Sequence, residues 1–129
     1  MQRPPAYTGL ARVWHALFYS LSGLRHALRE ESAFRQEAVL IGVLTGFALW
    51  LPISRATFLS LVLAQLLVLI VELLNSSIES VVDKVSPEFH VLAKNAKDMG
   101  SAAVLLSLLY LGLCWSLAIY ECFAPSVAR

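Results

Sequence analysis

The stretch ATFLSLVLAQLLVLIVELLNSSIESVV, residues 56–82, decides the fold. It is apolar over most of its length, and about 20 such residues cross the ~30 Å hydrocarbon layer of a bilayer as a helix. A helix satisfies its own backbone hydrogen bonds, so it is the expected way for this segment to cross. Besides a few hydroxyl residues, four amide or acidic side chains interrupt the run, and they are the first candidates for a functional role: Gln65, Glu72, Asn75 and Glu79.

The whole chain has the composition of a membrane protein. Hydrophobic residues make up 58% and charged residues 15% of its 129 residues, against ~45–50% and ~25% in average soluble domains. The mean hydropathy is +0.70. A net charge of +1 is too small for the basic field that a nucleic-acid partner requires. These values favour a small integral membrane protein with a single domain, residues 1–129, over a soluble enzyme or a disordered chain.

Two more stretches join the first as candidate spans. Residues 38–53 and 101–120 contain no charged residue. Pro52 and Ser54 predict a turn, because proline ends one helix and serine caps the next. Pro87 predicts the second break, since proline disfavours helix in the residue before it. We therefore expect an all-α membrane protein with three spans, at about 33–52, 55–84 and 92–121.

The N-terminal segment, about residues 6–29, predicts an amphipathic helix on the membrane surface. Its large apolar residues recur three or four positions apart, while Arg25 and Arg29 lie largely off their stripe. Aromatic and aliphatic groups on one side and cations on the other suit a helix at the interface. A soluble helix packed on a core is the less favoured alternative. The stripe consists of Leu10, Val13, Trp14, Leu17, Phe18, Leu21 and Leu24.

The basic residues predict the orientation in the membrane. Five of the ten lysines and arginines precede the first apolar stretch, residues 38–53, and three lie between the other two, residues 56–82 and 101–120. The positive-inside rule places this side in the cytoplasm. Three spans then put the N-terminus in the cytoplasm and the C-terminus outside. The eight cations are Arg3, Arg12, Arg25, Arg29, Arg35, Lys84, Lys94 and Lys97.

A polar stripe runs along the second span. At about 100° per residue, its members share one face of the helix. Glu72 is expected inside the apolar layer near its cytoplasmic edge, and Glu79 just beyond it. A carboxylate at the bilayer centre costs at least ~2.5–3.5 kcal/mol, so a functional role is the default hypothesis for such a group. The stripe consists of Gln65, Glu72, Asn75, Glu79 and Asp83.

Two other groups of polar residues, at the starts of the first and third spans, are expected on the same cytoplasmic side of the membrane as Glu79. Carboxylates are ligands that Mg²⁺ shares with phosphates, Lys97 and Arg12 can meet phosphate oxygens, and a glutamate can take a proton from an alcohol. These are the parts that phosphoryl transfer needs. Solvated ion pairs, Asp83 with Lys84 and Lys94 with Asp98, are the simpler alternative. The first span opens with Glu30, Glu31, Arg35 and Glu37, and the third with Lys94, Lys97, Asp98 and Ser101.

Three runs of sequence resemble the bacterial membrane diacylglycerol kinase family: VELLNSSIESVVDKV at 71–85, AKDMGSAAVLL at 96–106 and GLRHALREESAFRQEA at 23–38. The resemblance implies an enzyme of phospholipid metabolism in the bacterial inner membrane, with the C-terminus in the periplasm. It transfers the γ-phosphate of ATP, with Mg²⁺, to the hydroxyl of diacylglycerol and gives phosphatidic acid. The family forms homotrimers, with three membrane helices and a surface helix per chain and with sites shared between chains.

The resemblance also implies roles for single residues. Glu72 matches the catalytic base, and Glu31 and Glu79 match the ligands of Mg²⁺. Asn75 and Asp83 are expected to support them from the same helix face. The nucleotide-contacting positions are Arg12, Tyr19, Glu31, Glu79, Glu88, His90, Lys97 and Asp98. The positions near the lipid are Arg12, Glu72, Ser101 and Trp115.

Three other interpretations stay open. An undecaprenol kinase uses the same scaffold and differs in the lipid that it phosphorylates. A small multidrug or proton-coupled transporter would use intramembrane glutamates such as Glu72, but has little use for Lys97 and Asp98 at the interface. A non-catalytic membrane subunit would lose nothing from the substitution Glu72→Gln.

Overall fold

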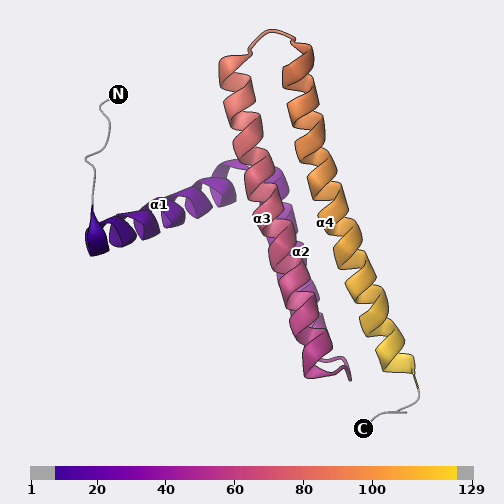
Figure 1. Cartoon of the computed structure of the whole chain (residues 1–129). Coiled ribbons are helices and arrows are strands. Elements are labelled where there is room, and N and C mark those ends of the chain that lie inside the picture. The colour runs from indigo at the N-terminus through magenta and orange to yellow at the C-terminus, as the bar shows by residue number, and fades with distance from the viewer. Residues whose placement is uncertain (1–7, 125–129) are drawn as a thin grey trace.

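The computed structural model describes residues 8–124, which form four helices. They are α1 (Gly9–Glu30), α2 (Ser32–Ala48), α3 (Arg55–Val85) and α4 (Val91–Phe123) (Figure 1). The prediction of an all-helical chain is confirmed for this part. The first residues of the expected surface helix, 6 and 7, and the cation Arg3 lie outside the described residues.

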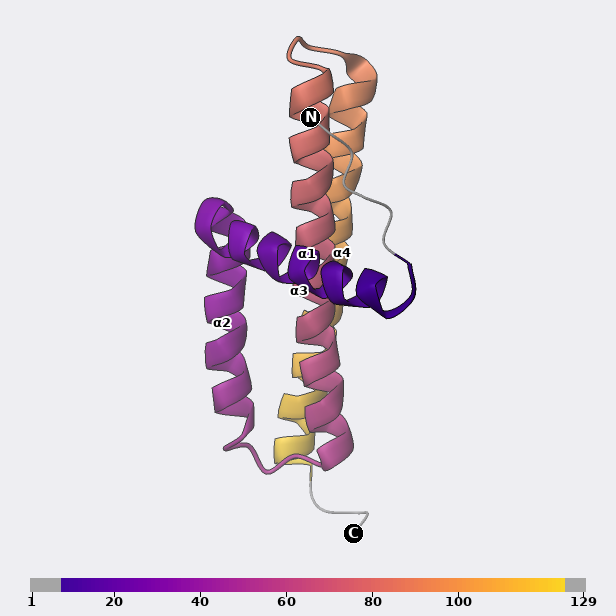
Figure 2. The same ribbon diagram turned by 90° about the vertical axis from the view of Figure 1, so that its left-hand side faces the viewer.

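Helices α3 and α4 form a long antiparallel hairpin, and α2 runs beside α3 (Figures 1 and 2). Helix α1 turns away from this bundle (Figure 1), and the half of α1 nearer the bundle lines a cavity together with α3. The hairpin continues past the level of α1 to the connection between α3 and α4. That projecting end carries the loop at residues 86–90 and the polar first turns of α4.

The ends of the helices follow from local chemistry. Ser54 caps α3, because its Oγ accepts a hydrogen bond from the backbone N–H of Thr57, 3.2 Å away. Glu121, near the end of α4, accepts hydrogen bonds from the backbone N–H of Ser54 at 2.6 Å and from the hydroxyl of Thr57. Helix α2 ends at Ala48, short of residue 52. The backbone N–H groups of Trp50 and Leu51 then bond to the carbonyls three residues earlier, which tightens the chain into the turn before Pro52.

Small and aliphatic residues hold α3 against α4. Ala64 and Ala118 are completely buried, and small side chains let two helices approach closely. Trp115 packs against the same core and stacks on Phe47 of α2, with ring centroids 6.1 Å apart. The buried core consists of Ala48, Leu61, Ala64, Val68, Leu111, Cys114 and Ala118.

Two helices are long and apolar enough to cross a membrane. The most apolar segments of α3 and α4 have mean hydropathies of 2.4 and 2.2, and only 28% and 17% of those segments is buried within the chain. The core helix of a soluble protein would be mostly buried. Helices of this kind therefore suit a lipid environment.

Candidate active site

The polar stripe predicted on residues 65–83 lies on the face of α3 that packs against the other helices. Gln65, Glu72 and Asn75 are 2%, 4% and 9% exposed. Gln65 Oε1 accepts a hydrogen bond from Thr45 Oγ1 of α2 at 2.5 Å. Asn75 Nδ2 donates to Glu79 Oε1 at 3.2 Å, one turn along the same helix. The prediction of one shared face is therefore confirmed for the members that the chain buries.

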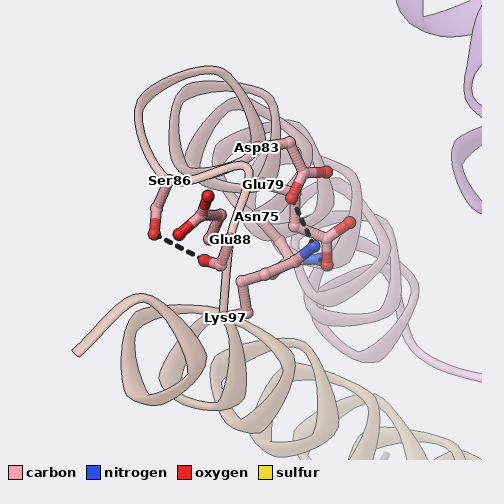
Figure 3. A network of polar contacts seen from close by, with 6 residues as sticks. All are labelled: Asn75, Glu79, Asp83, Ser86, Glu88 and Lys97. Atoms are coloured by element: carbon pink, nitrogen blue, oxygen red, sulfur yellow. Dashed lines mark hydrogen bonds and ion pairs between the residues drawn. The ribbon is translucent and has the colours of Figure 1, made fainter. Parts of the chain in front are cut away.

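Lys97 brings a cation from α4 to this face of α3 (Figure 3). Its Nζ lies 2.8 Å from Asp83 Oδ1 and within electrostatic range of Glu79. Asp83 therefore pairs across the helix interface, and the alternative that it pairs with its neighbour Lys84 is wrong. The expected pair of Lys94 and Asp98 does form, on an exposed helix surface. An exposed pair of this kind contributes only ~0–1 kcal/mol to stability.

Three carboxylates gather where α1, α2 and α3 meet. Glu31 stands at the junction of α1 and α2, at the N-cap position of α2. Glu72 lies within electrostatic range of both Glu31 and Glu79. Carboxylates that lie within electrostatic range of one another repel each other unless a proton or a bound cation offsets their charge. The arrangement therefore suits a cationic ligand.

The carboxylates fit a Mg²⁺ ion only when other ligands accompany it. Within residues 8–124, no three His, Cys, Asp or Glu side chains converge closely enough to hold a metal ion by themselves. Mg²⁺ is commonly bound by one or two carboxylates together with substrate phosphates and water. Glu31 and Glu79 are carboxylates of this kind, and each lies within electrostatic range of Glu72.

Glu37 belongs to the polar residues that open the first span, but the sequence assigns it no role of its own in the site. It lies within electrostatic range of Glu72, and its Oε2 is buried without a hydrogen-bond partner among the described residues. A signal was present in the sequence, because none of the residues three or four positions away is a cation. An unpaired carboxylate at the start of an apolar run marks a functional candidate.

A cavity of about 480 Å³ lies between the end of α3 and the start of α4. His90 stands at its entrance as the N-cap of α4, with Nδ1 accepting a hydrogen bond from the backbone N–H of Leu92 at 3.2 Å. Ser86 Oγ donates to the carbonyl of Glu88 at 3.1 Å and shapes the loop (Figure 3). Five of the predicted site residues line this cavity: Asp83, Glu88, His90, Lys97 and Asp98.

A second cavity, of about 470 Å³, lies between α1 and α3. Its wall is mostly apolar, and three serines of α3 line it. Glu31 lines it as well, so it adjoins the carboxylate cluster. Its polar lining consists of Ser20, His26, Glu31, Ser76, Ser77 and Ser80.

Other predicted site residues lie apart from this cluster within one chain. Arg12 and Tyr19 are exposed on the N-terminal half of α1, which points away from the bundle (Figure 1). Ser101 is exposed on α4. Trp115 packs against the buried core, whose α3 members Leu61, Ala64 and Val68 all precede Glu72 along the helix.

The fold and the site define a small helical protein of membrane type with an acidic cluster at one end of its helical bundle. The family model of the prokaryotic diacylglycerol kinases matches residues 18–119. Diacylglycerol kinase from Escherichia coli (strain K12) is 43% identical over 116 residues, which are 90% of this chain and 95% of that protein. The Pseudomonas aeruginosa protein of the same name is 50% identical over 109 residues, 84% of this chain and 89% of that protein.

A third relative is similar over a comparable length. Diacylglycerol kinase from Helicobacter pylori is 46% identical over 120 residues, which are 91% of this chain and 94% of that protein. The chain belongs to the prokaryotic diacylglycerol kinase family.

Proposed function

We propose that this protein is a lipid kinase that transfers the γ-phosphate of MgATP to the hydroxyl of 1,2-diacylglycerol and releases phosphatidic acid. The observation that carries the proposal is the similarity to relatives named diacylglycerol kinase over almost their whole length. The acidic cluster adds support from chemistry, because phosphoryl transfer depends on positioned carboxylates and cations.

In the proposed site, Glu31 and Glu79 hold the Mg²⁺ ion together with phosphate oxygens of ATP. When bound, the ion neutralises charge on the phosphates. Lys97 contacts the phosphates, and its position between Asp83 and Glu79 supports this role. The cavity beside Glu88, His90 and Asp98 takes the nucleoside, and it has room for one because its volume is about 480 Å³.

Glu72 accepts the proton of the acceptor hydroxyl. The oxygen of diacylglycerol then forms a bond to the γ-phosphorus while the bond to the β-phosphate oxygen breaks, giving ADP and phosphatidic acid. The burial of Glu72, which is 4% exposed, supports this role because it keeps the carboxylate out of water on a helix of membrane-spanning length. Glu72 and Glu79 lie two turns apart on one helix, so α3 holds both substrates in proximity.

The proposed setting is the bacterial inner membrane, with α2, α3 and α4 as spans and α1 on the cytoplasmic surface. The N-terminus is cytoplasmic and the C-terminus periplasmic. The apolar stripe of α1 supports the surface position, because Leu10 and Trp14 are 89% and 61% exposed in the single chain. A lipid interface removes that apolar area from water.

The proposed assembly is a homotrimer in which one chain completes the site of its neighbour. The direction of α1 supports sharing, since its N-terminal half carries Arg12 and Tyr19 away from the acidic cluster of its own chain (Figure 1). Within the proposed site, Arg12 and Tyr19 reach the nucleotide of an adjacent chain, and Arg12 also lies near its lipid. Ser101 borders the lipid headgroup, and Trp115, deeper in the membrane, contacts acyl chains.

A phosphotransferase assay tests the proposed substrate. The purified protein in detergent micelles receives ATP labelled in the γ-phosphate, with diacylglycerol in one reaction and undecaprenol in a parallel one. Labelled phosphatidic acid is the expected product. Labelling of undecaprenol alone would show that the protein is a lipid kinase with undecaprenol, not diacylglycerol, as its substrate. Labelling of neither lipid by a folded sample would overturn the proposal.

A further inference from the structure

A glycine of α4 makes room for a polar side chain of α3. Gly100 is buried, and a Cβ at this position would overlap with Asn75 Oδ1 and lie 3.4 Å from Asn75 Cγ. Among the residues that the structure describes, Gly9 alone has a positive φ, so Gly100 has ordinary helical backbone angles. The close approach of Asn75 explains the glycine at position 100, whereas backbone conformation does not.

The contact also fixes which way the carboxamide of Asn75 points. Asn75 Nδ2 donates to Glu79 Oε1 at 3.2 Å. Asn75 Oδ1 is buried, and within residues 8–124 it has no N–H or O–H partner. The Cα–H of Gly100 faces this oxygen, a weak contact that recurs at helix–helix interfaces. The reversed amide would place its oxygen against the carboxylate of Glu79, so the observed orientation is the favourable one.

The carboxamide has little space in which to adjust. Asn75 is 9% exposed and is enclosed between its own helix and α4. A methyl group at position 100 would therefore displace the carboxamide and take Nδ2 away from Glu79. The carboxylate of Glu79 would lose the donor that holds it in the cluster with Glu72 and Lys97.

We propose that Gly100 is a positioning residue that acts through Asn75 to fix the carboxylate of Glu79 for MgATP. This inference rests on the proposed role of Glu79 in the kinase site. The series is Gly100 on α4, Asn75 on α3, then the proposed magnesium ligand. The lipid does not contact any of these three residues in the proposed site, so a substitution at Gly100 should change the KM and the binding constant for MgATP and leave the KM for the lipid unchanged.

The test compares two glycine-to-alanine substitutions in the same helix. At Gly112, the added Cβ would have no described atom within 4 Å apart from the adjoining residues and backbone of its own helix, whereas at Gly100 it meets Asn75. Both substitutions raise helix propensity equally. Gly100→Ala is expected to raise the KM for MgATP at least tenfold and leave the KM for diacylglycerol within twofold. Gly112→Ala should leave both within twofold.

Binding without turnover gives an independent measurement. Calorimetry with Mg²⁺ and a non-hydrolysable ATP analogue should show at least tenfold weaker binding for Gly100→Ala than for Gly112→Ala. Wild-type binding by Gly100→Ala would overturn the inference. A wild-type protein that binds the nucleotide but phosphorylates no diacylglycerol would refute the proposed function alone, because the comparison of the two binding constants would still stand.

A double-variant cycle shows whether the effect passes through Asn75. Asn75→Ala removes both the donor to Glu79 and the atom that the new methyl meets. As a single substitution it should therefore already weaken nucleotide binding. Adding Gly100→Ala should then change binding by less than twofold. Independent, multiplying effects would contradict the inference. If Gly100→Ala does not fold, the double variant should fold again; if it also stays unfolded, the collision lies elsewhere and the inference fails.

Discussion

At the scale of single residues, the acidic face of α3 divides into a buried part and a more accessible part. Glu72 is 4% exposed, while Glu79 is partly exposed and receives the amide of Asn75. A buried carboxylate suits contact with a lipid hydroxyl, and an accessible one suits contact with a nucleotide that arrives from water. Separate kinetic signatures therefore follow for the two glutamates.

Glu72→Gln should lower kcat by about 10²–10⁴-fold, because the amide keeps the shape of the carboxylate but cannot accept a proton. The binding constant for MgATP should stay within about threefold of wild type, a margin of ~0.6 kcal/mol. Steady-state kinetics and calorimetry on the same samples measure both. Near-normal turnover by this variant would show that Glu72 is not the base.

Glu79→Gln and Glu31→Gln should raise the concentration of Mg²⁺ needed for half-maximal activity by about tenfold or more, because a neutral amide is a weaker ligand for this cation. Glu30→Gln is the matched control, since it removes the same charge from the exposed residue next to Glu31. A titration of Mg²⁺ at fixed ATP measures the effect. An unchanged Mg²⁺ requirement in Glu79→Gln would refute its assignment as a ligand.

At the scale of helices, α3 and α4 are joined at both ends by polar contacts. Lys97 and Asp83 connect them beside the site, and Glu121 receives Ser54 and Thr57 at the far end. The far contact caps the start of α3 from the opposite helix, and it leaves the acidic cluster untouched. Stability and catalysis should therefore respond separately to changes at the two ends.

Glu121→Ala should lower the thermal unfolding midpoint by several degrees, because the first turn of α3 loses two hydrogen bonds that its donors make to the carboxylate. Kinase activity below the transition should remain unchanged. Ser116→Ala is a suitable control, since among residues 8–124 the Ser116 hydroxyl bonds only to the carbonyl of Gly112 in its own helix. An unfolding midpoint equal to that of wild type would contradict the role of this cap.

Helix periodicity predicts contacts within one helix better than contacts between helices. The spacing of Glu72, Asn75 and Glu79 predicts their common face, and the structure confirms it. The partner of Asp83 depends on how far α4 slides along α3, which no spacing within one helix determines, so its pairing with Lys97 was not predicted. The contact between Gly100 and Asn75 was missed for the same reason.

At the scale of the whole molecule, the acidic cluster lies within the bundle of α2, α3 and α4, whereas α1 points away from that bundle (Figure 1). Two of the expected nucleotide-binding residues, Arg12 and Tyr19, lie on α1. The sequence predicted the helical class and the place of the cluster on α3. It did not predict where α1 points, because that direction depends on the short junction between Glu30 and Ser32. The outward direction makes sharing between chains testable.

Mixing two inactive variants should restore activity if α1 serves the site of a neighbouring chain. Arg12→Ala removes a group on α1, and Glu72→Gln removes the base on α3, so a mixed assembly contains some sites with both residues intact. Glu72→Gln mixed with Glu79→Gln is the control, because both residues belong to one helix and no exchange of α1 repairs either. If both mixtures show only background activity, the result would contradict the proposal that neighbouring chains share a site.

The most direct test of the central claim measures transfer of labelled γ-phosphate from ATP to diacylglycerol by the wild-type protein and by Glu72→Gln, with and without Mg²⁺. The claim predicts that the wild type labels phosphatidic acid only in the presence of Mg²⁺, and that the variant does so about 10²-fold or more slowly. Equal labelling by folded wild type and variant, or no labelling by either, would contradict it.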